Sequence, residues 1–407
     1  MPVLRDIPPT AGFPLRVQEI ISGLTSVQGG DPLADDFKKY LGVPYARTTC
    51  SGTAALFLIC CAIRNLTSRR TVIIPSFICP LVPLALHRAG FTVAVCDIEA
   101  SGFNFDRPRL DALCASNKDI AALIVNHLAG IPAEVETALT AARKHHILVI
   151  EDCAQALGAL SNGRHVGTRG DFAFFSLAAG KGLTMYEGGM MVTPHAQYAP
   201  LLDAGAAQYA HKNAVMETIR VLELLGYWLF YRPLLFWFVF TLPQQMWRLL
   251  GNDIRALRED FSASFPLHAV SRFRTGVAHS VFARLDGEIA RQREKAGWYI
   301  RDLAGCAGIE LLQEYAGDRA TYPYVTLVFD DPAARDRALK AGSRLGAGVS
   351  QIYARAIGDY PYLNTIVSPD GCDNARLLAC RALTLSTNSF LAEKEAAGVA
   401  AAIRDVL

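Results

Sequence analysis

Short apolar runs alternate with helix-length segments between residues 71 and 193. Continuous apolar runs of this length are typical of parallel strands that are buried on both faces of a sheet. The predicted strands are 71–74, 92–95, 121–125, 147–150, 171–175 and 189–193. The segments between the first four are long enough to be crossover helices, and they lie near 79–89, 107–116 and 133–145. The pattern therefore predicts a layered α/β lobe.

A second region follows this lobe. Apolar positions spaced by threes and fours between residues 268 and 303 predict one long helix. The elements predicted after it are strands near 308–312 and 323–329 and helices near 331–344, 372–381 and 391–405. This mixture indicates a smaller α/β lobe. We therefore divide the chain into a large domain, residues 1–265, and a small C-terminal domain, residues 266–407.

An apolar segment, residues 224–243, lies in an insertion at about 220–250. Its two halves meet at Arg232-Pro233, and neither reaches the ~20 residues with which a helix spans a bilayer. A proline and an arginine at the midpoint argue against one continuous span. The tryptophans and arginines in or beside it are Trp228, Trp237, Trp247, Arg220, Arg248, Arg255 and Arg258. Two interpretations stay open: an interfacial hairpin on a membrane surface, and an apolar cover buried against another subunit.

Composition narrows the classes of partner. A chain of 407 residues is long enough for two lobes that share a cleft. Its formal charge of +2 gives no reason to expect nucleic acid as a partner. The ten cysteines form no Cys-x-x-Cys pair, so we expect no metal site, no disulfide framework and a cytoplasmic protein. Residues 1–6 lack the start of a signal peptide, so no export is expected.

Two short pieces favour a site for a phosphate-bearing cofactor. Residues 50–56 form a small-residue turn that opens an apolar helix, where backbone N–H groups and a hydroxyl could hold a phosphate. The alternative is an ordinary Ser- or Thr-capped core helix. Asp152 directly follows an apolar strand, at the sheet end where open parallel sheets bind ligands. The alternative for Asp152 is a cap on the next helix.

Two further pieces surround a lysine. Lys181 lies between Gly180 and Gly182, and an amine that is removed from water loses its proton more readily, as a Schiff-base lysine must. A lysine taken alone would more often be solvated. Ser176 could add a hydrogen bond to a phosphate, and the turn Glu187-Gly188-Gly189 allows close approach of the backbone.

The order and spacing of Gly52-Thr53, Glu151-Asp152-x-Ala154-Gln155, Ser176 through Lys181 and Glu187-Gly188-Gly189 resemble the DegT/StrS family of sugar aminotransferases. The resemblance runs to about residue 195 and returns more weakly from about 265. It implies the fold type I architecture of transferases that depend on pyridoxal 5'-phosphate (PLP): a large lobe with a mostly parallel seven-stranded sheet and a smaller C-terminal α/β lobe. It also implies a homodimer, nucleotide-linked keto-sugars as acceptors and glutamate as amino donor.

The resemblance also implies roles for single residues. Lys181 matches the lysine that carries PLP and moves the proton, and Asp152 matches the partner of the ring nitrogen. Gln155 matches the neighbour of the ring's phenolic oxygen. The phosphate holders are Gly52, Thr53 and Ser176.

The chain departs from the family in places that matter for the substrate. Where the family stacks an aromatic residue on the PLP ring, this chain offers Cys79, with Phe77 as the alternative. His268 is one guess for the residue that reaches the neighbouring subunit's phosphate. Three functions stay in view: amino transfer to a nucleotide-activated sugar, the same chemistry on a lipid-linked or other amphipathic carbonyl compound, and a catalytically silent membrane-associated regulator. Docking on the inner face of a membrane is open as well.

Overall fold

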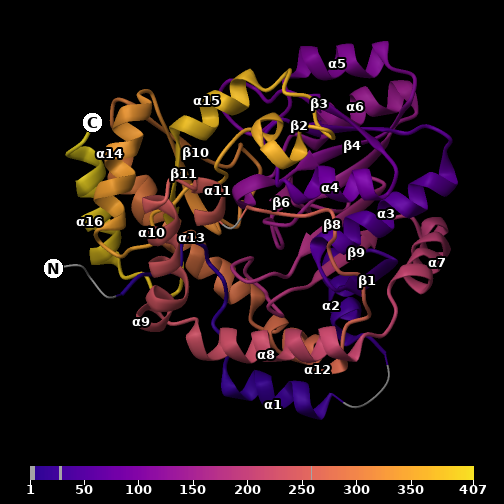
Figure 1. The fold of residues 1–407 in the computed structure, drawn as a ribbon, viewed down its shortest axis with the longest axis horizontal. Coiled ribbons are helices and arrows are strands. Elements are labelled where there is room, and N and C mark those ends of the chain that lie inside the picture. Colours follow the sequence, from indigo (N-terminus) through magenta and orange to yellow (C-terminus); the bar gives the residue numbers. More distant parts are fainter. Residues whose placement is uncertain (1–4, 27–29, 258) are drawn as a thin grey trace.

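The computed structural model describes residues 5–26, 30–257 and 259–407. Arg258, one of the arginines near the insertion, and the first four residues of the N-terminal stretch lie outside them. Figure 1 shows most of the N-terminal half on one side of the molecule and the C-terminal elements on the other. The two predicted lobes therefore lie next to each other.

The large lobe contains a seven-stranded sheet with the order β1-β9-β8-β5-β4-β2-β3. Its strands are β1 (Tyr45–Thr49), β2 (Thr71–Pro75), β3 (Thr92–Cys96), β4 (Ile120–Asn126), β5 (Leu148–Asp152), β8 (Phe172–Ser176) and β9 (Gly189–Thr193). The sheet is mostly parallel, because only β9 runs against its two neighbours. All six predicted strands are confirmed. The edge strand β1 was not predicted, because its sequence, Tyr-Ala-Arg-Thr-Thr, carries no apolar run.

Helices cover both faces of this sheet. The helices of the lobe are α1 (Val17–Thr25), α2 (Pro32–Leu41), α3 (Gly52–Leu66), α4 (Leu81–Arg88), α5 (Arg107–Ser116), α6 (Val135–His145) and α7 (Ala199–Tyr209). Alternate residues of β2 face opposite layers, since Val72 packs in one core with α3 and α4 whereas Ile73 packs in another with α5 and α6. The crossover helices are thus confirmed. A short hairpin, β6 (Leu160–Ser161) and β7 (Arg164–His165), follows β5.

The small lobe contains an antiparallel sheet with the order β10-β11-β12. Its elements are β10 (Ile309–Leu312), β11 (Tyr324–Phe329), α14 (Pro332–Ser343), α15 (Asp373–Arg381), β12 (Ala382–Ser386) and α16 (Glu393–Arg404). The two predicted strands and three predicted helices are confirmed. Strand β12 was missed because it follows α15 without an intervening turn.

The single long helix predicted between residues 268 and 303 is wrong. Two helices occupy this region, α12 (Arg272–Phe282) and α13 (Leu285–Leu303). At the break, Arg284 donates hydrogen bonds to the Glu19 carboxylate and the Pro14 carbonyl. The apolar spacing continues across the break because Val277 of α12 and Leu285 of α13 enter the same core. The division at residue 266 stays a prediction; α12 itself packs with α1 and α2.

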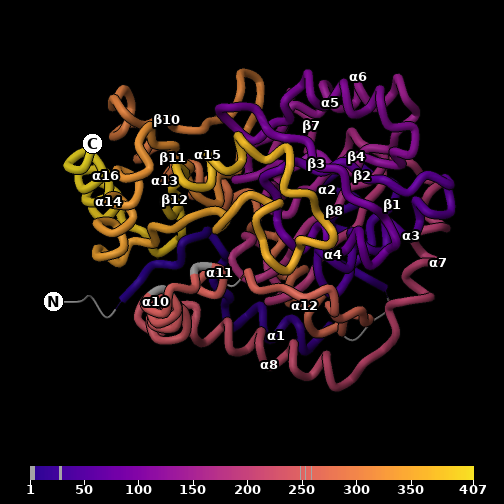
Figure 2. The backbone as a smooth tube through the Cα atoms, turned by 45° about the horizontal axis from the view of Figure 1, so that its top comes forward, coloured from indigo at the N-terminus to yellow at the C-terminus, as the bar shows by residue number. Residues whose placement is uncertain are grey.

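The insertion forms helices that turn back at the predicted point. The helices are α8 (Ala214–Phe230), α9 (Pro233–Phe236), a π-helical turn (Trp237–Thr241), α10 (Leu242–Leu249) and α11 (Asp253–Ala256). Among the described residues no single helix has the length and apolarity of a membrane span, but α8 and the run 233–247 together do, with a bend of 118° between them. Figure 2 shows α8 along one side of the molecule, with α10 beside the N-terminal segment.

Candidate active site

Asp152 lies at the carboxyl end of β5, where a parallel sheet binds ligands. Its side chain is buried, and Oδ1 accepts a hydrogen bond from Ala154 N–H at 3.0 Å. No helix begins directly after it in the described chain, so the helix-cap alternative is wrong. The adjacent Glu151 fixes this strand end: it lies 3.0 Å from His127 Nε2 and accepts three backbone N–H groups at 2.7 Å. Burial alone would raise the pKa of Glu151, but these bonds outweigh it and lower the pKa.

The predicted phosphate holders lie together at the N-terminus of α3. The side chain of Ser51 caps this helix by accepting a hydrogen bond from Ala54 N–H, as the alternative interpretation expects, and the phosphate site at the same turn stays a prediction. A side chain at Gly52 would meet Ser176 Cβ at 3.1 Å, and one at Gly189 would collide with the carbonyl of Ser51. The backbones of α3, β8 and β9 therefore touch, as the glycine turn predicted. Thr53 is half-buried in the first helical turn, whose N–H groups form an anion-binding end.

Lys181 lies in the loop between β8 and β9. Its backbone N–H donates to the Ala178 carbonyl at 3.1 Å, which closes a tight turn. Gly180 and Gly182 have φ angles of +83° and +73°. Other residues rarely adopt this left-handed backbone, so both glycines are required by conformation, and at Gly180 an added Cβ would also lie 2.5 Å from the Thr10 hydroxyl.

The Lys181 amine and the Asp152 carboxyl are close enough to influence each other. Burial lowers the pKa of Lys181, and nearby Cys79 and Asp152 oppose this shift. Burial raises the pKa of Asp152 to about 6, and the N–H of Ala154 and the charge of Lys181 oppose it. A buried carboxyl in this state lacks a full positive partner, which a protonated ring nitrogen would supply.

The two stacking candidates have different surroundings. Phe77 is buried, and its ring packs against Phe103 and Tyr353 with centroids 6.4 Å and 5.2 Å away. Cys79 is half-buried, and its thiol pKa, raised by burial to about 11, is influenced by Lys181 and Asp152. Stacking on the ring stays a prediction for either residue.

Gln155 is held by residues that motif reading missed. Its Oε1 accepts a hydrogen bond from the Tyr324 hydroxyl at 2.5 Å and another from Ala129 N–H at 3.2 Å. Tyr324 belongs to β11 of the small lobe, 169 residues further along the chain. No local sequence pattern could have paired the two side chains.

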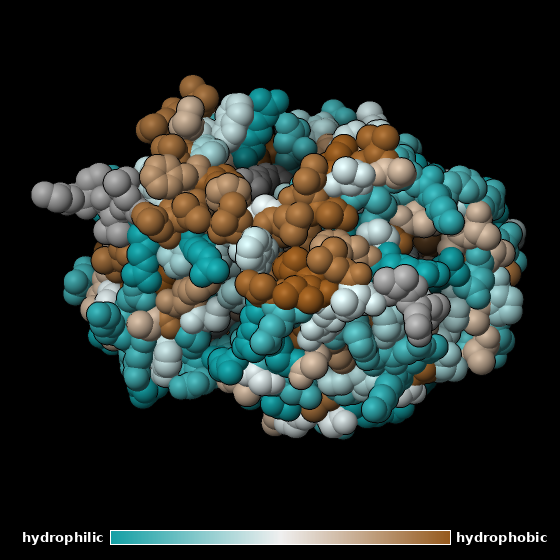
Figure 3. All heavy atoms as spheres, turned by 90° about the horizontal axis from the view of Figure 1, so that it is seen from below, coloured by the Kyte–Doolittle hydropathy of each residue, from teal (hydrophilic) through white to brown (hydrophobic). Residues whose placement is uncertain are grey.

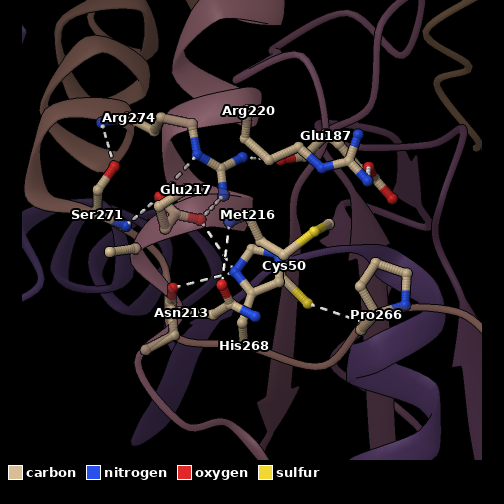
Figure 4. A network of polar contacts seen from close by, with 12 residues as sticks. Cys50, Glu187, Asn213, Met216, Glu217, Arg220, Pro266, His268, Ser271 and Arg274 are labelled. Carbon is tan, nitrogen blue, oxygen red and sulfur yellow. Dashed lines mark hydrogen bonds and ion pairs between the residues drawn. The ribbon is translucent and has the colours of Figure 1, made fainter.

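A polar network contacts Glu187 in the loop that carries Lys181 (Figure 4). The fully buried Arg274 pairs with Glu217 of α8 and donates to the Glu187 carbonyl, near the end of the loop. Burial would raise the pKa of Glu217, but hydrogen bonds from His268 and Arg274 outweigh it and lower the pKa to about 2. His268 itself is buried, with Nδ1 3.0 Å from Glu217 Oε1, so in this chain it contacts its own subunit.

Lys181 faces a cavity of about 510 Å³, a size typical of ligand sites. Its walls are formed by the N-terminal residues Pro8, Pro9 and Thr10, by Gln155, and by the lysine loop, the insertion and the small lobe. The small lobe contributes Tyr324 and residues 350–353. Gln155 and Lys181 thus line one cavity, and Asp152 lies close enough to Lys181 for their charges to interact.

Residues 16–211 match the model of the DegT/DnrJ/EryC1/StrS aminotransferase family. This match covers 196 of the 407 residues, so the N-terminal half of the chain is similar to this family. The match ends shortly before α8, so the helical insertion lies outside it.

Comparison with individual proteins gives the same family. The chain is 28% identical over 404 residues to a UDP-N-acetyl-3-dehydro-alpha-D-glucosamine 3-aminotransferase from Acidithiobacillus ferrooxidans, covering 97% of this chain and 95% of that protein. Protein MosB of Rhizobium meliloti is 36% identical, but the chain spans only 30% of its length. Spr1654 from Streptococcus pneumoniae, solved in its PLP form, has the same fold with a TM-score of 0.75, 17% identity and 98% coverage of both chains.

These findings confirm the predicted fold class and the predicted resemblance to this family, and they agree with the predicted enzyme class and PLP cofactor. All ten cysteines are free thiols, as expected from their spacing.

Proposed function

We propose that this chain transfers an amino group from an amino acid to a keto group of a sugar, with Lys181 and Asp152 as the central residues. The observation that carries the proposal is the proximity of the buried Asp152 carboxyl, whose pKa is raised, to the half-buried Lys181 amine, whose pKa is lowered and which lines the cavity. Bound PLP would supply the electron sink for the electron pair that stays on the substrate carbon when its proton is removed.

Each residue has a separate task in this proposal. Lys181 would hold PLP through its amine, which burial keeps closer to neutral, and the amine once released from PLP would move the proton. Asp152 would keep the ring nitrogen protonated, and Gln155 would lie beside the phenolic oxygen. The phosphate holders are Gly52, Thr53 and Ser176, at the N-terminus of α3.

The proposal extends to the partners. The name of the full-length relative supports a nucleotide-activated keto-sugar as acceptor. We propose glutamate as the donor and a homodimer as the working form, both by resemblance to the family. Ten free thiols favour the reducing cytoplasm.

A visible spectrum tests the proposal. The purified protein incubated with PLP should be yellow, and glutamate should bleach it as the cofactor accepts the amino group. Lys181→Ala should fold, bind PLP without the yellow absorption and lose at least about 10²-fold in amino transfer, because a positioned proton-transfer group is gone. Lys340→Ala, on α14 of the small lobe, is the matched control and should behave as wild type. A colourless wild type, or a fully active Lys181→Ala, contradicts the proposal.

A further inference from the structure

We infer that the acceptor of this chain carries a hydrocarbon group, which lies along an aromatic wall of the insertion and leads away from Lys181. This rests on the proposed amino transfer to a keto-sugar and concerns only the carrier of that sugar, which we infer to be lipid-like in this chain although the relative's name gives its own acceptor a nucleotide.

The aromatic wall consists of Tyr227, Tyr231, Phe236 and Phe240, which all line the cavity that Lys181 faces. Their rings contact one another in succession. Tyr227 stacks on Tyr231 with centroids 4.3 Å apart, Tyr231 meets the edge of Phe236 at 5.9 Å, and Phe236 stacks on Phe240 at 4.7 Å. A continuous apolar surface therefore runs along one side of the cavity.

Hydrogen bonds fix this wall to the N-terminal segment of the large lobe. The Tyr227 hydroxyl donates to the Phe13 carbonyl at 3.1 Å, and the Tyr231 hydroxyl donates to the Thr10 carbonyl at 3.1 Å. The Asn388 amide donates to the Tyr231 hydroxyl at 2.9 Å. Because both hydroxyls are engaged, the rings present their apolar faces in a preformed arrangement, which lowers the entropic cost of binding.

The wall continues from the cavity to the surface. Phe230 and Val239 line the same cavity and are 41% and 48% exposed. Next to them along the insertion, Leu234 and Phe238 are 56% and 50% exposed. Figure 3 shows hydrophobic residues gathered on the face that α8 borders. A chain that leaves the cavity along Phe230 and Val239 would thus stay in apolar contact.

The charges of the cavity favour a hydrocarbon over a nucleotide diphosphate. Diphosphates are commonly bound by arginine, lysine, metal ions or the N–H groups of a helix N-terminus. Among the described residues that line the cavity, Lys181 is the only lysine or arginine, and the proposed function commits it to PLP. Glu223, also in the lining, is paired with Arg220, which is itself paired with Glu187. The apolar wall gains from burying methylenes, at ~0.8 kcal/mol each.

The test compares two carriers of the same sugar. Binding of butyl, hexyl and octyl β-glucoside, below their micelle concentrations, and of UDP-glucose is measured by calorimetry on PLP-loaded protein. We expect affinity to rise by up to about fourfold per added methylene, the equivalent of ~0.8 kcal/mol. Octyl glucoside should bind at least tenfold more tightly than butyl glucoside, and UDP-glucose should not displace it. A flat chain-length series, or displacement by UDP-glucose, overturns the inference.

Two variants with a matched control locate the effect. Val239→Asp and Phe230→Ser should each weaken octyl glucoside binding at least tenfold. Leu222→Asp, an exposed position on α8 outside the cavity lining, should change it less than twofold. Equal losses of octyl glucoside affinity in the Val239→Asp and Leu222→Asp variants overturn the inference. It is also overturned if affinity does not change with chain length and Val239→Asp splits a dimer. The glutamate-dependent bleaching is read on the same samples, so failure of the proposed function is recognised separately.

Discussion

At the scale of single residues, the proposed site shields two ionisable groups, the Lys181 amine and the Asp152 carboxyl, from water. Burial shifts both pKa values toward the neutral forms: that of Lys181 falls and that of Asp152 rises to about 6. A neutral amine is the nucleophile that PLP requires, whereas the carboxyl regains its charge when a protonated ring lies beside it. Asp152 should therefore give the protein without PLP a pH-dependent stability.

The prediction for Asp152 concerns the protein without PLP. A carboxyl whose pKa is raised on folding stabilises the fold fully below its unfolded pKa and loses this contribution as the pH rises through about 6. Relative to Asp152→Asn, the wild type should lose up to about 3 kcal/mol of unfolding free energy between pH 4 and pH 7. Urea unfolding of both proteins across this range measures the difference. A difference in unfolding free energy that stays constant across this pH range would contradict the raised pKa. Added PLP should reduce the pH dependence of stability in the wild type but not in Asp152→Asn.

A second residue-scale prediction concerns the cradle at the N-terminus of α3. Gly189→Ala places a methyl group against the backbone of Ser51 and Gly52, which cannot move without shifting the helix. We expect a loss of ~1–3 kcal/mol in stability and weaker retention of PLP on dialysis. Gly287→Ala on α13, where a methyl group meets nothing within 4 Å, is the control and should gain ~0.5–1 kcal/mol. Unchanged PLP retention in Gly189→Ala would argue against this phosphate site.

The sequence was informative where the neighbours of a residue in the chain indicate its role. Asp152 was predicted because it comes at the end of a buried strand, and Lys181 was predicted because glycines flank it. Tyr324 and Arg274 were not predicted, since they meet Gln155 and Glu217 only through the tertiary fold. Cys79 could be named as a candidate but not preferred over Phe77, because both lie just after the same strand.

At the scale of elements, buried strands were predicted well and boundaries inside one amphipathic face were not. Strands β2 to β5 are continuous apolar runs between turn residues, which the chain marks clearly. The break between α12 and α13 has no such mark, because both helices face one core and Arg284 fixes the break through contacts with Glu19 and Pro14. Hydrophobic spacing reports the buried face of a helix, not its ends.

The element-scale prediction concerns the contact between α8 and α12. Arg274→Met leaves the Glu217 carboxylate without its main partner in a mostly buried position, which should cost ~3–5 kcal/mol. Because Arg274 also donates to the Glu187 carbonyl, the lysine loop should loosen and PLP retention should fall. Thermal unfolding and dialysis measure the two effects. Arg301→Met, at an exposed position, serves as the control. Adding Glu217→Gln to Arg274→Met should restore part of the stability, because it removes the unpaired carboxylate. No recovery in the double variant would contradict the ion-pair argument.

At the scale of the whole molecule, three separate parts of the chain complete one cavity. The large lobe supplies Lys181, the small lobe supplies Tyr324 and Gln351, and the insertion supplies the aromatic wall. The family relationship covers the first of these parts through residue 211. The insertion adds a surface outside the region that matches the family. Whether its outer face binds a membrane or a second subunit distinguishes the two interpretations left open by the sequence.

If the acceptor carries a hydrocarbon, the outer face of the insertion should meet the lipid that contains it. Leu234 and Phe238 point apolar surface outward beside the cavity mouth, and aromatic and apolar side chains of this kind bind the head-group boundary of a bilayer. We expect the wild type to sediment with anionic liposomes and Phe238→Asp to stay in the supernatant. Leu377→Asp, an equally exposed position on α15 of the small lobe, should sediment as the wild type does. The same apolar area can serve either a membrane or a second subunit. This face would be assigned to the second subunit if the wild type stays in the supernatant and polar replacement of Trp237 or Phe238 abolishes dimerisation.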